Sequence, residues 1–221
     1  MHAEKRSYLQ LLSNAITTSK EIFRFPNDPL VNEHAKISDA DINQVRDALH
    51  LIWRRDFGHI FGLYWGNKCQ YLSAHIAAFT ITVLGLPAEI IIGEVSINGT
   101  LEYDTTLEGL KSEYFSQTPL KGNQNLHAWV SIGGDVIIDA ALSDRLARYY
   151  MVPRDRLPDV MVGQASMFLH SGLNFSACYQ PIIYGSDFLE KTAKISPSIL
   201  MPVYQEIYAD SIQQQNTATY D

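Results

Sequence analysis

Gly66-Asn67-Lys68-Cys69 opens the stretch that decides the fold, because a long apolar run follows it without a break. Leu72, Ile76, Phe79 and Val83 recur in this run at steps of three and four residues. Apolar side chains at that spacing lie on one face of an α-helix. Since small and apolar residues also fill the flanks, the pattern predicts a helix that is buried nearly all round.

The predicted helix begins at Cys69 and ends before Gly85-Leu86-Pro87. Glycine accepts the left-handed conformation that ends many helices, and proline cannot donate the next backbone hydrogen bond. Cys69 then lies in the first turn, where unpaired N–H groups and the helix dipole favour a thiolate, the nucleophilic form of cysteine. The alternative is that Cys69 is a small buried hydrophobic residue without a chemical role.

Two later stretches predict antiparallel strands. Residues 88–97 are rich in β-branched side chains and predict a largely buried strand. Residues 127–132 and 136–141 flank Gly133-Gly134-Asp135, where glycine permits the positive φ angles of a tight turn, so this segment predicts a β-hairpin. The sequence therefore predicts a helix followed by a sheet.

The hydrophobic pattern of the hairpin selects its register. The apolar residues of its two strands share a face when a three-residue loop pairs Ile132 with Val136. In that register Trp129 lies opposite Asp139. His127 then falls on the same face as Asp139, diagonally displaced and within side-chain reach.

A histidine held by a carboxylate can act as a general base, because the carboxylate selects the tautomer and stabilises the charged ring. Cys69, His127 and Asp139 would supply a nucleophile, a base and an orienting group in that chain order. The alternative for His127 and Asp139 is a half-buried hydrogen bond with a structural role only.

The N-terminal part of the chain is predicted to be helical. Residues 7–23 have helical hydrophobic spacing, and Ser38 is a favourable N-cap for a second helix that should end near Gly58. Residues 98–126 are less regular and mostly acidic among their charged residues, so they are predicted to form a solvated excursion over the surface.

The C-terminal part is predicted to be irregular from Leu142 onward, with a last helix that opens at Pro197. The glutamine-rich tail after residue 212 is expected to be disordered. We expect a single domain over residues 1–221, with its core at about 62–142.

Composition excludes some classes of partner. The 221 residues carry a formal charge of −7 with a pI near 5.4 and no cluster of Lys and Arg, which argues against binding to nucleic acid. A chain of this length does not need a disulfide, so Cys69 and Cys178 are expected to be reduced. No continuous apolar run suggests a signal peptide or a membrane span, so a cytoplasmic location and no membrane partner are expected.

Several short motifs, taken together, resemble one family. They are Gly66-x-x-Cys69 and its helix, Leu84-Gly85-Leu86-Pro87-Ala88, His127-Ala128-Trp129-Val130, and Ile138-Asp139. In order and spacing they resemble the core of the transglutaminase-like branch of the papain-like cysteine superfamily. The resemblance covers roughly residues 62–142.

The resemblance implies an α+β fold in which a helix with a nucleophilic cysteine packs on an antiparallel sheet with a histidine and an aspartate. It assigns Cys69 as nucleophile, His127 as base and Asp139 as third member of a catalytic triad. It also implies an oxyanion donor upstream of the cysteine, for which Trp65 and Asn67 are candidates beside the Cys69 backbone N–H. We expect Trp129 to shield the His–Asp pair.

The expected function is a cysteine-dependent hydrolase or acyltransferase that acts on an amide or ester through a thioester. Hydrolysis is favoured, because water needs no second binding site. Peptides, proteins or small amides are the expected substrates, no cofactor is expected, and the oligomeric state stays open. The alternatives are a non-catalytic peptide-binding module, an enzyme similar to arylamine N-acetyltransferases, and a metal site of Cys69, His127 and Asp139.

Overall fold

A computed structural model describes residues 7–52, 55, 64–116, 126–165, 169–170 and 175–210. Its fold is α+β, as predicted. The strands are β1 (Glu89–Ile97), β2 (Thr100–Leu101), β3 (His127–Gly133), β4 (Val136–Asp139), β5 (Met161–Gln164), β6 (Leu169–His170) and β7 (Phe175–Tyr184). The helices are α1 (Tyr8–Thr18), η1 (Ser19–Phe23), α2 (Asp39–Ile52), α4 (Cys69–Thr82), α5 (Leu107–Phe115), α6 (Leu142–Tyr149), η3 (Arg154–Arg156), α7 (Ser186–Ala193) and α8 (Pro197–Ile207).

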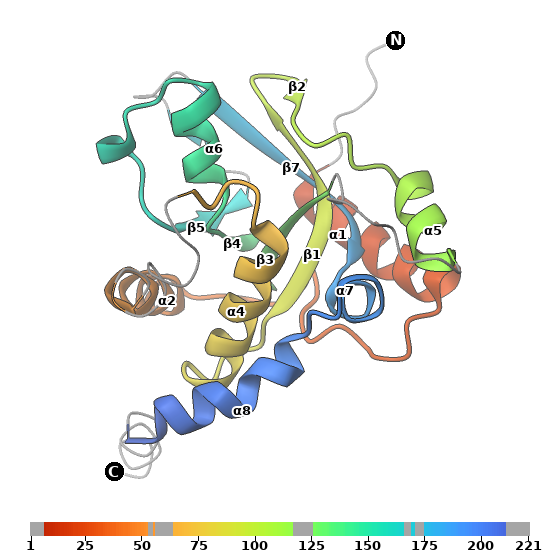
Figure 1. The fold of residues 1–221 in the computed structure, drawn as a ribbon, viewed down its shortest axis with the longest axis horizontal. Coiled ribbons are helices and arrows are strands. Elements are labelled where there is room, and N and C mark those ends of the chain that lie inside the picture. Colours follow the sequence, from red (N-terminus) through yellow and green to blue (C-terminus); the bar gives the residue numbers. More distant parts are fainter. Residues whose placement is uncertain are drawn as a thin grey trace.

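One antiparallel sheet organises the molecule, with strands in the order β5-β4-β3-β1-β7-β6 and the short β2 attached to β1. Figure 1 shows α4 in front of the sheet and α1 behind it. Helix α4 packs on β3 and β1 and is covered in turn by α8, while α1 packs on β7. None of the helices in the described ranges combines the length and apolar character needed to cross a membrane.

The two N-terminal helices begin at capping motifs. Ser7 accepts a hydrogen bond from the Gln10 backbone, and the Gln10 side chain accepts one from the Ser7 backbone. Ser38 and Asp41 cap α2 in the same reciprocal way, which confirms the predicted N-cap. The predicted end of this helix near Gly58 lies outside the described residues.

The hairpin follows the predicted register except at its tip. Val130 pairs with Ile138 as predicted, but Gly133 lies opposite Val136, so the predicted three-residue loop that pairs Ile132 with Val136 is wrong. A β-bulge at this point takes up one extra residue and leaves the register farther down the strands unchanged. Gly133 and Gly134 both have positive φ, and the Gly134 N–H donates to the Asn32 carbonyl at 2.9 Å.

The C-terminal part is more regular than predicted. Strand β7 runs for ten residues and pairs with β1 over residues 91–97, so it lies inside the sheet rather than in an irregular segment. Its side chains alternate between buried and partly exposed, a pattern that small and polar residues and Pro181 mask in the sequence. Helix α8 begins at Pro197 as predicted, and the tail after residue 212 lies outside the described residues.

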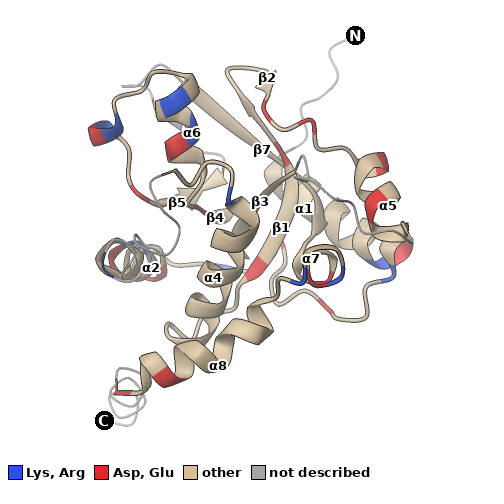
Figure 2. Cartoon of the chain, in the orientation of Figure 1, with Lys and Arg blue, Asp and Glu red and all other residues tan. Residues whose placement is uncertain are grey.

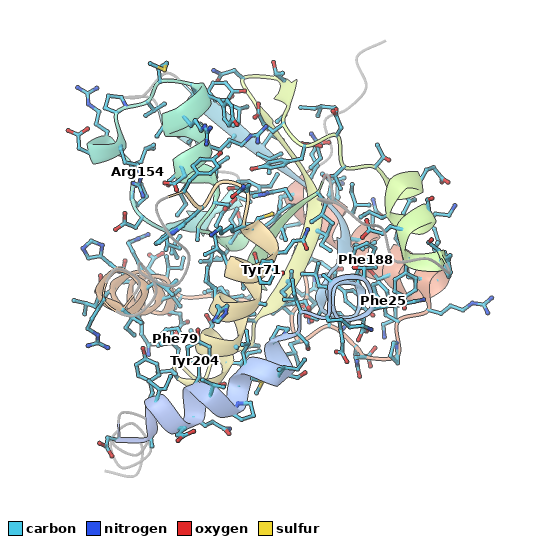
Figure 3. The ribbon with its side chains drawn as sticks, in the orientation of Figure 1. Phe25, Tyr71, Phe79, Arg154, Phe188 and Tyr204 are labelled. Carbon is cyan, nitrogen blue, oxygen red and sulfur yellow. The ribbon has the colours of Figure 1, made fainter. Side chains whose placement is uncertain are left out.

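Aromatic side chains fill the space between the helices and the sheet. In Figure 3, Phe79 lies beside Tyr204 between α4 and α8, and their ring centroids are 5.9 Å apart. A second group joins η1, α5 and α7, where Phe23 and Tyr114 pack against Phe188. These contacts fix α4 against α8 and hold η1, α5 and α7 together.

Strand β1 begins with a buried carboxyl group. Glu89 is 5% exposed and accepts hydrogen bonds from the Ile90 N–H and the Ser186 hydroxyl. Burial raises the pKa of Glu89 to about 7 from an ordinary value of 4.5, although these bonds lower it. Because folding raises this pKa, the stabilisation is fully present below about pH 4.5 and is lost as the pH rises through about 7.

We expect Glu89→Gln to remove this pH dependence, because the amide does not titrate. Between about pH 5 and 8.5 the wild type should lose up to about 3 kcal/mol of unfolding free energy relative to the variant. Urea unfolding of both proteins across this range measures the difference. Parallel stability curves would show that Glu89 titrates alike in the folded and unfolded states.

Candidate active site

The start of α4 is fixed against the start of β3 by two side chains one helical turn apart. The Cys69 thiol donates to the Leu126 carbonyl at 3.5 Å, and the Ser73 hydroxyl donates to the Ala128 carbonyl at 3.0 Å. These carbonyl groups belong to the residues on either side of His127. These two bonds align the helix so that the Cys69 thiol lies at the start of β3, next to His127.

His127 and Asp139 form the predicted contact. His127 Nε2 donates to Asp139 Oδ2 at 2.6 Å, and neither side chain is more than 1% exposed. The same carboxylate oxygen accepts a hydrogen bond from the Tyr179 hydroxyl at 2.9 Å. Its other oxygen accepts from the backbone N–H groups of Ala141 at 2.8 Å and Leu142 at 3.0 Å. Four donors therefore satisfy the buried carboxylate.

The electrostatics of the pair favour its charged form. Burial alone would lower the pKa of His127, but the charge and hydrogen bond of Asp139, together with the nearby Cys69 side chain, outweigh burial and raise this pKa to about 10. Burial would raise the pKa of Asp139, yet the His127 charge and the hydrogen bonds from His127, Ala141 and Leu142 hold it below its usual value. At neutral pH the site therefore holds an imidazolium beside a carboxylate.

The second ring nitrogen of His127, Nδ1, differs from Nε2 in its contacts. Nδ1 is buried and has no hydrogen-bond partner among the described residues. Since Asp139 occupies Nε2, Nδ1 is the ring nitrogen that is left to exchange a proton with Cys69. The Cys69 thiol raises the pKa of His127 without meeting the geometry of a formed hydrogen bond. Such loose contacts in a resting site often tighten when substrate binds.

A loop after β2 encloses the histidine, which corrects the prediction of a solvated excursion for its residues. The Tyr103 ring stacks on the His127 ring with centroids 4.4 Å apart and an angle of 12° between the planes. Thr105 Oγ1 accepts the His127 backbone N–H at 3.3 Å. On the other side of the Tyr103 ring lies the Arg145 guanidinium, 4.4 Å from the centroid, which also pairs with Glu102.

Glu94, a buried residue of β1, holds this loop in place. Its Oε1 accepts the backbone N–H groups of Val95, Glu102 and Tyr103 at 2.8 to 3.0 Å, and its Oε2 accepts that of Thr105 at 2.7 Å. In Figure 2 the charged residues lie mainly toward the periphery, and Glu94 is one of two acidic residues on β1. The carboxylate therefore fixes the position of the Tyr103 ring above His127.

Of the residues predicted to support the triad, Trp129 and Trp65 are buried and Asn67 is exposed. Trp129 is fully buried, its ring lies 5.7 Å from the His127 ring, and its indole N–H donates to the Tyr8 hydroxyl at 3.1 Å. Trp65 is buried and donates its backbone N–H to Asp144, whereas Asn67 is exposed in the turn before α4. An oxyanion role for Trp65 or Asn67 stays a prediction, as do the catalytic roles of the triad.

The side chain of Lys68, the N-cap residue of α4, makes no capping hydrogen bond. Backbone N–H groups in the first turn are thus not covered by a capping side chain. Helix α4 itself contains no charged residue, as Figure 2 shows. The backbone N–H groups in the first turn of α4 can therefore donate hydrogen bonds to a negative charge that forms next to the Cys69 sulphur.

Glu94, Tyr103 and Tyr179 shape the site and were not predicted from the sequence. Glu94 carried a signal, since a single acidic residue inside a buried strand needs partners. Tyr179 lies on β7, whose strand pattern was not recognised, and Tyr103 lies in a loop without periodicity. No local pattern connects either tyrosine with His127 or Asp139.

Both cysteines are free, and Cys178 is partly exposed on β7. Within the described ranges, no group of three or more His, Cys, Asp or Glu residues is arranged to hold a metal ion. The carboxylate of Asp139 already accepts four hydrogen bonds, so the alternative of a metal site at the triad gains no support from this geometry. Comparison with protein-family models, curated proteins and solved structures finds no match to this chain.

We expect Glu94→Gln to destabilise the fold by about 1–3 kcal/mol, because the amide nitrogen cannot accept a backbone N–H and leaves a buried donor unsatisfied. Glu108→Gln is the matched control, since Glu108 lies on the exposed side of the following helix. Urea unfolding of the two variants checks the difference. Equal stabilities would show that the loop does not depend on the Glu94 carboxylate.

Proposed function

We propose that the chain is a cysteine-dependent acyl-transfer enzyme, with hydrolysis of an amide or ester as the favoured reaction. The observation that carries the proposal is the state of the His127 ring, whose Nε2 is held by Asp139 and whose buried Nδ1 is left without a partner near the Cys69 thiol. An imidazole arranged in this way can take the thiol proton and return it to a leaving group.

The first half-reaction would form a thioester. In the resting pair the proton of Cys69 is held on His127 Nδ1, and the Cys69 thiolate adds to the carbonyl carbon of the substrate. The resulting oxyanion would be stabilised by N–H groups at the start of α4. The carbon–nitrogen or carbon–oxygen bond to the leaving group then breaks, and His127 donates its proton to that group.

The second half-reaction would release the acyl group. His127 takes a proton from water, and the oxygen of the water adds to the thioester carbonyl. The carbon–sulphur bond breaks, a carboxylic acid leaves, and the sulphur remains as a thiolate beside the His127 imidazolium, which restores the resting pair. Asp139 keeps its negative charge throughout and stabilises the imidazolium. An amine in place of water would make the same chemistry a transfer.

The arrangement of elements supports the proposed likeness to the papain and transglutaminase core. A cysteine begins a buried helix, and a histidine and an acid lie on neighbouring antiparallel strands. This likeness extends the proposal to peptides, proteins or small amides as substrates. Fold alone does not define a reaction, so the assignment depends on the chemistry of the thiol.

A non-catalytic binding module with the same fold is the second candidate. The burial of the two reacting side chains favours it. Cys69 is 6% exposed, and His127 is fully buried. A thiol that is merely packed in this way should be inert. The reactivity of Cys69 therefore separates the two candidates.

We expect iodoacetamide to alkylate Cys69 faster than Cys178 at about pH 6.5, because an imidazolium and a helix N-terminus both favour the thiolate. Exposure alone predicts the opposite order, since Cys178 is partly exposed and Cys69 is buried. Mass spectrometry of each cysteine against time measures the two rates. His127→Ala is the control and should remove the advantage of Cys69. Equal rates, or a faster Cys178, would favour the binding module.

Asp139→Asn should preserve the fold and lower turnover by roughly a hundredfold or more. The asparagine oxygen can accept the two backbone N–H groups, so its amide nitrogen faces His127 Nε2 and donates to it. This bond would place the ring proton on Nδ1, where it blocks the uptake of a proton from Cys69. Thiol alkylation at neutral pH serves as the readout before a substrate is known, and thermal melting reports on folding. Unchanged alkylation with a large loss of stability would assign Asp139 a structural role only.

A further inference from the structure

Tyr103 contains a buried polar atom that packing does not explain. Its hydroxyl is inaccessible to solvent and has no hydrogen-bond partner among the described residues. A buried hydroxyl without a partner costs about 1–3 kcal/mol. Native proteins contain few such groups, and each one calls for a reason such as a catalytic role.

The position of this hydroxyl suggests the reason. The Tyr103 ring lies parallel to the His127 ring with centroids 4.4 Å apart. His127 Nδ1 is the other buried polar atom at this place without a partner in the described part of the chain. Two stacked rings at the Cys69 end of β3 therefore each present an unsatisfied polar atom.

The surroundings of Tyr103 keep its hydroxyl protonated. Burial, followed by the charges of Cys69 and Asp139, raises the pKa of Tyr103 well above its ordinary value of 10. The Cys69 thiol bonds to the Leu126 carbonyl and the Tyr103 ring stacks on the adjacent His127, so both side chains lie at the same end of β3. The phenol consequently stays protonated at neutral pH and is available as a donor.

We propose that Tyr103 is a further catalytic residue, whose hydroxyl donates a hydrogen bond to the Cys69 thiolate and then to the oxyanion that forms when Cys69 adds to a carbonyl. The inference rests on the proposed function of Cys69 and deepens it. The hydroxyl keeps its proton in both states, while the negative charge moves from the sulphur to the carbonyl oxygen. Hydrogen bonds to a charged group are about twice as strong as neutral ones, so the donor favours both states.

The ring itself is held without the help of its hydroxyl. The Arg145 guanidinium covers its outer face at 4.4 Å, and Glu94 binds the Tyr103 backbone N–H at 3.0 Å. Removal of the hydroxyl alone should therefore leave the stack on His127 in place. Tyr103→Phe isolates the donor from the packing.

The test is the pH profile of Cys69 alkylation by iodoacetamide in a Cys178→Ser background. Tyr103→Phe should move the midpoint of the profile up by about 0.5 to 1 pH unit, because the thiolate loses a donor. The rate at high pH should hardly change, since a fully formed thiolate is nucleophilic in either protein. The melting temperature should not fall, because the ring stays packed and the variant buries no unsatisfied hydroxyl. 3-Fluorotyrosine in place of Tyr103 keeps the hydroxyl, makes it a stronger donor, and should move the midpoint down.

Tyr71→Phe is the matched control, because Tyr71 lies two residues after Cys69 on α4 and is 54% exposed, as Figure 3 illustrates. Its profile should coincide with that of the wild type. A Tyr103→Phe profile that coincides with the wild type, or an equal shift from Tyr71→Phe, would overturn the role of Tyr103 and leave the proposed function standing. A wild-type midpoint at the free-thiol value of about 8.5 would instead overturn the proposed function itself.

Discussion

The structure depends on the burial of a charged pair, His127 and Asp139, inside the protein. An ion taken out of water costs several kcal/mol unless partners replace the water. The protein supplies these partners from three elements: His127 from β3, Tyr179 from β7, and two backbone N–H groups from the start of α6. β7 must therefore lie inside the sheet, and the chain must turn into α6 directly after β4. A large part of the topology follows from the need to satisfy one carboxylate.

The two acidic residues of β1, Glu89 and Glu94, have different roles because their surroundings differ. Glu94 accepts four backbone N–H groups and serves as an anchor for a loop. Glu89 is buried to a similar degree, and burial outweighs its hydrogen bonds and raises its pKa to about 7. One carboxyl thus connects the sheet with the loop over His127, while the other makes the far end of the strand sensitive to pH. Neither role depends on catalysis.

Local patterns were sufficient to predict the parts of the site that are close in sequence. The start of α4 at Cys69 follows from helical spacing, and the contact between His127 and Asp139 follows from the alternation of a hairpin. Even there the predicted pairing at the tip of the hairpin was wrong. The bulge at Gly133 lies beside Gly134, whose N–H bonds to the carbonyl of Asn32, far away in the chain. Tyr103 and Tyr179 could not be predicted, since each reaches the site only through long-range pairing or a loop without periodicity.

The hydrogen bond between the Tyr184 N–H and the Ser19 hydroxyl joins residues 165 positions apart, and it closes the last strand of the sheet against the first helical segment. Contacts of such separation form slowly, because the entropy of a long loop is lost before the contact gives any stability. During synthesis, Cys69, His127 and Asp139 all leave the ribosome before β7, so the carboxylate at first lacks its tyrosine donor. A reactive thiol would therefore be assembled only after the chain has been made as far as β7.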